Sequence, residues 1–379
     1  MSVKKALILA SVASMIDQFN IPNIRLLQSL GYEVDTCADF TNPGTITAER
    51  AEQLKRRLGE MNVGIFDVAI PRTLSPRAIR SAYSHVRKLI ADGGYDLIHC
   101  HSPIGGAICR LAARDARKRG TRVIYTAHGF HFYSGAPLKN WLLFYPVEKY
   151  LSRCTDVLIT INREDYARAK ERFHAKQTVY VPGIGVDIDK IDSAHFDGEL
   201  RKSCSVLPGE IMLLSVGELN NNKNHDTAIK AIALLPERFK YVIVGKGEKE
   251  AALRALCAEL GMEDRVTFAG FRDDVHSFCK SADAFVFPSY REGLSLSLME
   301  AMAAGLPVVC SRIRGNTDLI DEGKGGFLSD PSDCKAFAES ILALFREDRV
   351  KIGRYNREKI SSFSIQRVLE EMKKIYGSI

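Results

Sequence analysis

Short apolar runs that predict buried strands alternate with helix-like segments along the whole chain. No other feature constrains the fold as strongly. In the first half, the predicted strands are residues 6–10, 33–37, 96–100, 123–126, 157–160 and 179–182. A second series comprises residues 211–216, 241–244, 266–268, 284–287 and 308–310. Alternating strands and helices favour parallel sheets covered by helices on both faces. We therefore expect an α/β protein with two doubly wound, Rossmann-like domains.

The length of 379 residues is enough for two domains of ordinary size. We place the first domain at residues 1–187 and the second at residues 188–360. The last segment, residues 361–379, contains a predicted helix at 365–376 whose apolar residues recur at helical spacing. Another helix is predicted at residues 22–30, and Gly31 ends it.

The composition is that of an ordinary globular protein, with 46% hydrophobic and 26% charged residues. No apolar run approaches the ~20 residues of a membrane span. The apolar run at residues 6–10 is too short for a secretory leader. The nine cysteines are scattered and form no C-x-x-C pair, so we expect a reducing, cytoplasmic environment.

The net charge of +7 is unevenly distributed. Residues 1–185 contain 26 Lys and Arg against 16 Asp and Glu, and the remainder contains 27 against 30. We expect the basic half to meet an anionic membrane surface or a lipid diphosphate, and not nucleic acid, because no aromatic-interleaved signature is present. A basic cluster on a predicted helix and the apolar stretch near Trp141 would contribute; the cluster consists of Arg110, Arg114, Arg117, Lys118 and Arg119. The alternative is a solvated basic face.

Glu292 and Glu300 bracket seven residues, in a run that leads from the strand at 284–287 into a predicted helix ended by Gly305. Eight helical steps cover about 12 Å, which exceeds the roughly 5 to 10 Å between paired carboxylates that hydrolyse glycosides. The amides just after Glu292 would open the helix and attract a phosphate. This spacing suits a nucleotide-sugar, which carries phosphate in its middle and hydroxyls at both ends. The alternative is that Glu292 is a helix-terminal charge and Glu300 a solvated one.

These residues and the blocks around them resemble the E-x7-E signature of family 4 retaining glycosyltransferases, which have the GT-B fold. The similar blocks cover most of the chain: residues 216–219 with Lys223, 242–247, 266–271, 282–289, 300–309, 315–320 and 325–328. Residues 127–132, Ala-His-Gly-Phe-His-Phe, resemble the subgroup that builds bacterial capsular and exopolysaccharides. The resemblance implies two Rossmann-like domains facing across a cleft, with a C-terminal helix crossing back to the first domain.

The resemblance also implies roles for individual residues. In the donor-binding second domain, Glu300 would hold the ribose hydroxyls and Lys223 the diphosphate, while Glu292 would approach the transferred sugar. The amides of Gly293, Leu294 and Ser295 would face phosphate and sugar. The base would lie near Gly245 and Phe271, and Gly217 is a further donor-binding residue. In the acceptor-binding first domain, His128 would lie against the donor sugar, and His128, Glu292 and Lys223 form the expected catalytic set.

Two positions depart from the family pattern. Glu218 occupies the place where family members usually carry an arginine for the diphosphate. Ser14 and Met15 occupy the place of a Gly-Gly pair after the first strand, so they are acceptor-side candidates together with His101. Histidines 99, 101, 128 and 131 resemble metal ligands, but histidines at strand ends more often line organic ligand sites. We therefore expect neither a metal nor another cofactor.

The expected function is a metal-independent retaining glycosyltransferase that uses a nucleotide-sugar, with UDP the expected nucleotide. Its expected acceptor is a polyprenyl-diphosphate-linked or other glycan, in cell-surface polysaccharide synthesis at the inner face of the cytoplasmic membrane. Two alternatives remain. One is a nucleotide-sugar epimerase of the same architecture, and the other is a non-catalytic glycan- or nucleotide-binding protein.

Overall fold

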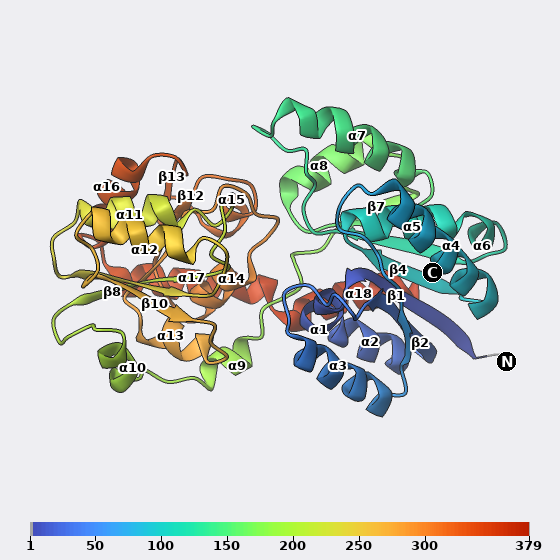
Figure 1. Ribbon diagram of the computed structural model, residues 1–379, viewed down its shortest axis with the longest axis horizontal. Helices are drawn as coiled ribbons and strands as arrows, with labels where there is room; N and C mark the ends of the chain where they lie inside the picture. The colour runs from blue at the N-terminus through green and yellow to red at the C-terminus, as the bar shows by residue number, and fades with distance from the viewer. Residues whose placement is uncertain (1–2, 379) are drawn as a thin grey trace. The chain divides into compact units, whose positions relative to one another are not determined.

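The computed structural model describes residues 3–378, which form two compact units (Figure 1). One unit contains the chain up to Ile184 and again from Val368 onward, and the other contains Gly185–Arg367. The sequence-based boundaries, after residues 187 and 360, lie within a few residues of the first division and seven residues before the second. In the described part of the chain, no helix combines the length and the apolar character that crossing a membrane requires.

The first unit is built on a seven-stranded sheet in the order β3-β2-β1-β4-β5-β6-β7, with all neighbours parallel. Its strands are β1 (Lys4–Val12), β2 (Tyr32–Asp39), β3 (Gly64–Asp67), β4 (Leu97–His101), β5 (Arg122–Ala127), β6 (Val157–Thr160) and β7 (Gln177–Tyr180). The order of strands reverses between β1 and β4. In sheets of this kind, ligands bind beyond the carboxyl ends of the strands at that reversal.

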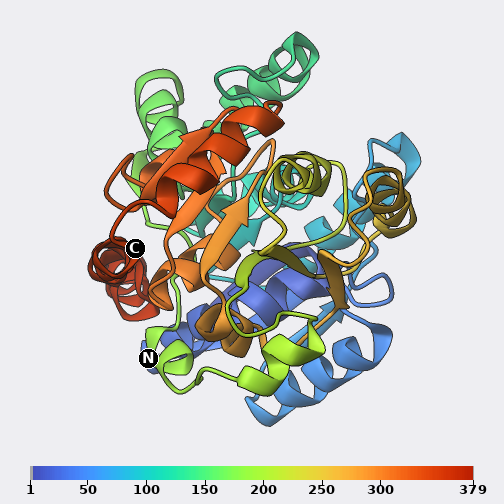
Figure 2. The ribbon, with the colours of Figure 1, turned by 90° about the vertical axis from the view of Figure 1, so that its left-hand side faces the viewer.

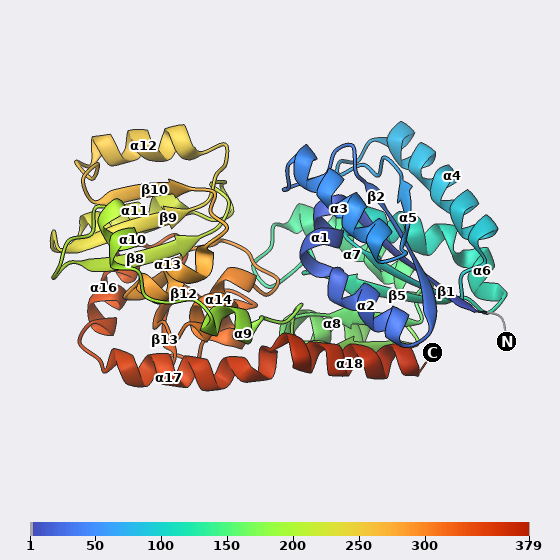
Figure 3. The same cartoon turned by 90° about the horizontal axis from the view of Figure 1, so that it is seen from below.

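Helices cover both faces of this sheet because alternate strand residues point to opposite sides. Ala6 and Ile8 of β1 belong to one buried cluster, and Leu7 and Leu9 belong to another. The helices are α1 (Ala13–Phe19), α2 (Ile21–Ser29), α3 (Ala48–Glu60), α4 (Pro76–Gly93), α5 (Pro103–Ala112), α6 (Arg114–Lys118), α7 (Leu138–Ser152), α8 (Arg163–Arg172) and α18 (Ile365–Gly377). Figure 3 shows α18, the last helix of the chain. Its buried residues Val368, Met372 and Ile375 complete the first cluster, so the C-terminal helix returns to the first unit.

The second unit has a six-stranded parallel sheet in the order β10-β9-β8-β11-β12-β13, with helices on both sides (Figure 2). Its strands are β8 (Ile211–Val216), β9 (Phe239–Val244), β10 (Val266–Gly270), β11 (Ala284–Phe287), β12 (Val308–Ser311) and β13 (Gly326–Ser329). The order reverses between β8 and β11. In doubly wound folds that bind dinucleotides, the ligand lies at this reversal.

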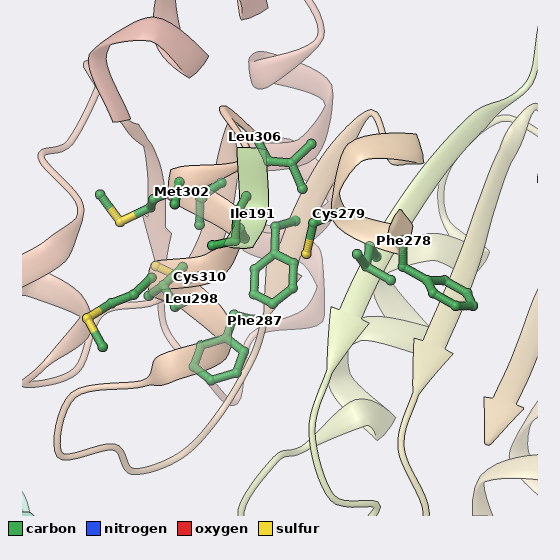
Figure 4. Close-up of a cluster of buried hydrophobic side chains, with 14 of the residues drawn as sticks. Ile191, Phe278, Cys279, Phe287, Leu298, Met302, Leu306 and Cys310 are labelled. Carbon is green, nitrogen blue, oxygen red and sulfur yellow. The ribbon is translucent and has the colours of Figure 1, made fainter. Parts of the chain in front are cut away.

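The helices of the second unit are α9 (Ile188–Asp192), α10 (Gly198–Ser203), α11 (His225–Ala233), α12 (Glu250–Glu259), α13 (Val275–Ser281), α14 (Leu296–Ala303), α15 (Asn316–Leu319), α16 (Cys334–Leu344) and α17 (Arg349–Ile360), with a 3₁₀ turn at Ser361–Phe363. The core between the sheet and α14 includes Phe287, Leu298 and Met302 (Figure 4). This packing fixes α14 against the strand that precedes it.

The predicted elements agree well with these bounds. Every predicted strand overlaps an observed strand, and the predicted helix 22–30 corresponds to α2 with Gly31 at a φ of 85°. β3 and β13 were not predicted, and each is a four-residue strand at one edge of its sheet. Edge strands are paired on one side only, so they need less apolar sequence and leave a weaker signal.

The prediction that Arg110 belongs to a basic surface cluster of the first domain is wrong. Arg110 is 1% exposed, and its guanidinium bonds the Glu148 carboxylate at 2.9 Å. Arg117 pairs with Asp156 at 2.8 Å, and the cluster is divided between two helices, α5 and α6. Burial between helices therefore removes Arg110 from the surface that the sequence suggested.

Candidate functional site

The loops after β8 and β11 meet at the reversal of the second unit's sheet. Lys223 lies in the first loop and Glu292 in the second, and the Lys223 Nζ–Glu292 Oε1 distance is 2.8 Å. Both side chains are mostly buried, with 19% and 12% exposed. The structure thus brings together two residues that stand 69 positions apart, at the sheet edge where doubly wound folds bind ligands.

Neighbouring contacts hold this pair in place. The Lys223 ammonium lies 4.8 Å from the centre of the Phe287 ring, at the end of β11. The Asn222 amide donates to the carbonyl of Arg291 at 2.9 Å, and the amide of Tyr290 donates to the carbonyl of Asn222 at 2.8 Å. Asn222 directly precedes Lys223 and Arg291 directly precedes Glu292, so these bonds join the two loops beside the ion pair and preorganise the lysine and the carboxylate.

Two glycines allow the loops after β8 and β9 to approach each other. Gly245 has a φ of 152°, and a Cβ at this position would lie 1.9 Å from the carbonyl oxygen of Gly217. A Cβ on Gly217 would in turn lie 3.1 Å from the Lys223 side chain. A side chain at Gly245 would collide with the backbone of the loop that carries Lys223, and a side chain at Gly217 would press on Lys223 itself.

The second loop differs in one detail from the sequence prediction. Helix α14 begins at Leu296, with the Ser295 hydroxyl accepting from the Leu298 amide, so Gly293, Leu294 and Ser295 precede the helix. Glu292 is therefore a loop residue, and the estimate of eight helical steps to Glu300 does not apply. The Ser295 cap takes up one amide of the first turn.

Arg314 is a neighbour of this loop that no sequence motif marks. It is 8% exposed, and its Nε donates to the carbonyl oxygen of Glu292 at 3.2 Å. The adjacent Gly315 lies so close to Gly293 that a Cβ would be 2.4 Å from the Gly293 carbonyl oxygen. A buried guanidinium beside the loop adds positive charge where phosphate was predicted to bind.

Glu300 also has a partner that the motif did not reveal. It lies on α14, and its carboxylate is 3.1 Å from His276 Nε2 on the neighbouring helix α13. Both side chains are mostly buried, with 18% and 14% exposed. No local pattern marks His276, because it comes near Glu300 only when α13 and α14 pack together.

Glu218 and Phe271 lie at more open positions. The Glu218 side chain is exposed and accepts from the Asn220 amide at 2.9 Å, without contacting Lys223 or Glu292. Phe271 follows β10 and is 67% exposed, which leaves its ring available to a flat ligand. The donor-binding roles expected for Glu300, Gly217, Gly245 and Phe271 remain predictions.

In the first unit, three histidines cluster at the carboxyl ends of β4 and β5. His101 Nδ1 and His128 Nε2 are 3.1 Å apart. His99 is hydrogen-bonded at one ring nitrogen to Tyr376 of α18 and at the other to Thr126, both at 2.8 Å. The rings of His99 and His101 are 4.2 Å apart, as expected for alternate residues of one strand.

Burial favours the neutral form of all three rings. It lowers the pKa of His99 to about 3 and that of His128 to about 4, and it holds the pKa of His101 well below the ordinary value. The neighbouring histidines add to this effect at His99 and His101. The cluster is therefore uncharged at neutral pH, and its nitrogens serve as hydrogen-bond donors and acceptors.

A cavity of about 30 Å³ adjoins the cluster and is lined by His99, His101, His128 and residues of α18. The Nε2 atom of His101 is buried and has no hydrogen-bond partner among the described residues. A polar cavity of this size holds about one water molecule. His128 and His101 thus share a polar site, but their roles toward a sugar or an acceptor remain predictions.

Ser14 and Met15 occupy the first turn of α1, directly after β1. The Ser14 amide donates to the carbonyl of Pro43 at 2.9 Å, and a Cβ on Gly44 would lie 2.5 Å from the Ser14 hydroxyl. The backbone of Ser14 is therefore already engaged within the first unit. Between residues 3 and 378, no group of three or more His, Cys, Asp or Glu side chains is arranged to hold a metal ion.

Family models match both halves of the chain. The model for glycosyl transferases group 1 matches residues 198–359, and a glycosyl transferase 4-like domain matches residues 23–183. EpsD of Bacillus subtilis (strain 168), named as a glycosyltransferase, is 37% identical over 99% of this chain and 97% of its own length.

A second relative and a solved structure are also similar to this chain. The Escherichia coli UDP-Gal:alpha-D-GlcNAc-diphosphoundecaprenol alpha-1,3-galactosyltransferase is 31% identical over 76% of this chain and 77% of its own length. HepE of Anabaena, solved with UDP-glucose, superposes with a TM-score of 0.78 at 19% identity, covering 99% of this chain and 100% of HepE. The chain therefore belongs to the group 1, family 4-like glycosyltransferases with the GT-B fold.

Proposed function

We propose that this protein is a retaining glycosyltransferase that moves one sugar from a UDP-sugar to a lipid-linked glycan in cell-surface polysaccharide synthesis. The observation that carries the proposal is the preorganised Lys223–Glu292 pair at the sheet reversal of the second unit. The name of one relative supports the substrates, since it contains a UDP-sugar donor and a diphosphoundecaprenol acceptor. HepE supports the same donor class through its complex with UDP-glucose.

In this proposal, the second unit binds the donor. Lys223, the loop amides at 293–295 and the Arg314 guanidinium neutralise the diphosphate. Glu300, held by His276, accepts hydrogen bonds from the ribose hydroxyls. Charge on the diphosphate is thus met by fixed protein donors, and we propose that transfer requires no metal ion.

We propose the following transfer step. The oxygen of an acceptor hydroxyl forms a bond to the anomeric carbon as the bond from that carbon to the diphosphate oxygen breaks. The acceptor proton passes to the departing diphosphate oxygen, so no separate base is needed. The protein's contribution is positioning and stabilisation of the charge that grows on the diphosphate. The acceptor would be met at the inner face of the cytoplasmic membrane, where we propose that the protein associates peripherally.

The first test is a thermal-shift screen of UDP-, GDP- and ADP-sugars. A ligand at 100 times its dissociation constant adds about 2.7 kcal/mol to the free energy of unfolding, so the correct donor should stand out. The stabilising sugar is then supplied, radiolabelled, with a polyprenyl-diphosphate-linked acceptor in buffer containing EDTA. Transfer of label with retained anomeric configuration is the expected result.

Other results would overturn the proposal in different ways. An epimerised donor formed without acceptor would identify an epimerase. A donor that binds but is never consumed, with any acceptor tested, would identify a binding protein. Activity abolished by EDTA and restored by a divalent cation would refute the metal-independent mechanism.

A further inference from the structure

Helix α7 carries an exposed apolar face that the proposed transfer reaction does not explain. Five of the fifteen large hydrophobic residues that are exposed in the described chain lie on this helix: Leu138, Leu142, Leu143, Val147 and Tyr150. They are between 47% and 72% exposed. At 3.6 residues per turn they fall within about half of the helix circumference. We call these five residues the outer face of α7.

The opposite side of the helix is also apolar, but it is packed. Trp141, Phe144 and Tyr145 pack against the buried cluster on this side of the first sheet. The Trp141 ring also lies under the Arg168 guanidinium of α8, at 4.9 Å, and the two helices are neighbours in Figure 1. A helix that is apolar on all sides is normally buried. We therefore expect the outer face to be covered by a binding partner.

The charges of α7 indicate which kind of partner fits. Lys139 is exposed and Lys149 is partly exposed, whereas the helix has one acidic residue, Glu148. Glu148 is turned inward, where it accepts hydrogen bonds from Arg110 at 2.9 Å and from the Tyr125 hydroxyl at 3.3 Å. The solvent side of α7 thus combines large apolar groups with positive charge and has no carboxylate.

We propose that the outer face of α7 is the surface by which this protein docks on an anionic lipid bilayer. This inference rests on the proposed function, since a lipid-linked acceptor would be met at such a surface. The apolar side chains would enter the boundary between headgroups and acyl chains, as in interfacial amphipathic helices. The lysines would extend their ammonium groups to anionic headgroups while their alkyl stems stay in the apolar layer.

Charge favours lipid over a second copy of the chain as the occupant. In a two-fold symmetric pairing of α7 with itself, the same residues face each other. Lys139 and Lys149 lie near opposite ends of the helix, so an antiparallel pairing would place the lysines of one copy beside those of the other. An anionic bilayer instead offers each lysine an opposite charge.

Co-sedimentation of the full chain with vesicles tests the proposal. The vesicles contain either phosphatidylcholine alone or phosphatidylcholine with phosphatidylglycerol. Lys139→Gln with Lys149→Gln should lower partitioning onto the anionic vesicles by about thirtyfold, because each basic residue near such a surface contributes about a fivefold change. Leu138→Gln with Leu142→Gln should lower it by at least about tenfold.

Matched controls separate α7 from other exposed residues. Leu207→Gln with Val350→Gln removes comparably exposed apolar groups from the second unit, and Lys118→Gln with Arg119→Gln removes two charges from the C-terminal end of α6 and its cap. Both controls should partition within about threefold of the wild type. Equal losses in the controls and the α7 variants, or none in the α7 variants, would overturn the proposal.

Trp141 is the single tryptophan of the chain but packs inward, so the probe of the docking surface is placed at Leu142 on the outer face. In the variant Trp141→Phe with Leu142→Trp, vesicles that contain lipids brominated on their acyl chains should quench the tryptophan fluorescence on binding. Bound protein with unquenched fluorescence would mean that another surface docks. A dimer in sedimentation velocity that Leu138→Gln with Leu142→Gln dissociates, without any vesicle binding, would assign the outer face to a second copy.

Donor turnover separates this inference from the proposed function. The α7 variants should keep wild-type turnover of the UDP-sugar with a water-soluble acceptor analogue while losing vesicle binding. A wild-type protein that binds anionic vesicles through α7 but transfers no sugar would refute the proposed function and leave the docking surface standing.

Discussion

Replacing Lys223 by Ala tests the centre of the proposed donor site. The 2.8 Å separation corresponds to a gross attraction of about 6 kcal/mol at an effective dielectric constant near 20. Desolvation offsets most of this attraction, and hydrogen bonds to charged groups contribute about 1.5 to 3 kcal/mol net. In the free enzyme Lys223 is already paired with Glu292, so a bound diphosphate must share the ammonium with that carboxylate. The net gain in ground-state binding is therefore small.

The transition state differs because negative charge grows on the departing diphosphate. Loss of one preorganised donor at such a position lowers turnover by about 100- to 1000-fold, or about 2.7 to 4 kcal/mol. We expect Lys223→Ala to lower kcat by this amount while weakening donor binding by only about tenfold. Glu218→Arg in the same variant should restore part of kcat, because Glu218 is exposed on the same loop and takes the place of the family's usual arginine.

Steady-state kinetics and calorimetric titration of the UDP-sugar measure the two effects separately. Lys240→Ala is a matched control, because Lys240 pairs with Glu210 at 3.3 Å with similar burial, at the amino end of the same sheet. This control should lower the melting temperature without changing kcat. A folded Lys223→Ala protein with kcat within about threefold of the wild type would refute the reasoning.

Three further predictions concern other parts of the molecule. Glu300→Ala should weaken UDP-sugar binding about ten- to hundredfold with the fold intact, since charged hydrogen bonds contribute about 1.5 to 3 kcal/mol; unchanged affinity in calorimetry would exclude the ribose role. Arg110→Ala should lower the free energy of unfolding by about 3 to 5 kcal/mol, because it leaves Glu148 buried without its partner, and a urea midpoint close to the wild type would contradict this. Acidification from pH 7 to pH 5 should also lower the urea midpoint, because the unfolded chain binds protons below pH ~6.5 whereas buried His99 and His128 stay neutral down to pH 5. The loss is about 2 kcal/mol per histidine. Equal midpoints at the two pH values would show that these rings are not held neutral.

Two residues that were expected on a membrane-binding surface have partners inside the protein. From sequence, Arg110 belonged to a basic surface cluster, and Trp141 belonged to an insertion surface. In the structure Arg110 neutralises Glu148 inside the protein, and Trp141 packs inward. Arg110 and Glu148 are 38 positions apart, and the sequence between them carries no signal that these charges meet, because their contact depends on how α5 and α7 pack.

Local sequence by itself determined the α/β class, the positions of most strands and the C-terminal helix. Strands buried on both faces must be continuously apolar, and helices must repeat their apolar residues every three to four positions, so both patterns are readable within a few residues. Only the tertiary structure decided the partners: Lys223 with Glu292, His276 with Glu300, and the three clustered histidines. These pairs depend on the order of strands in the two sheets and on the packing of helices against them. That arrangement is set by the burial of the whole core, and no short stretch of sequence encodes it.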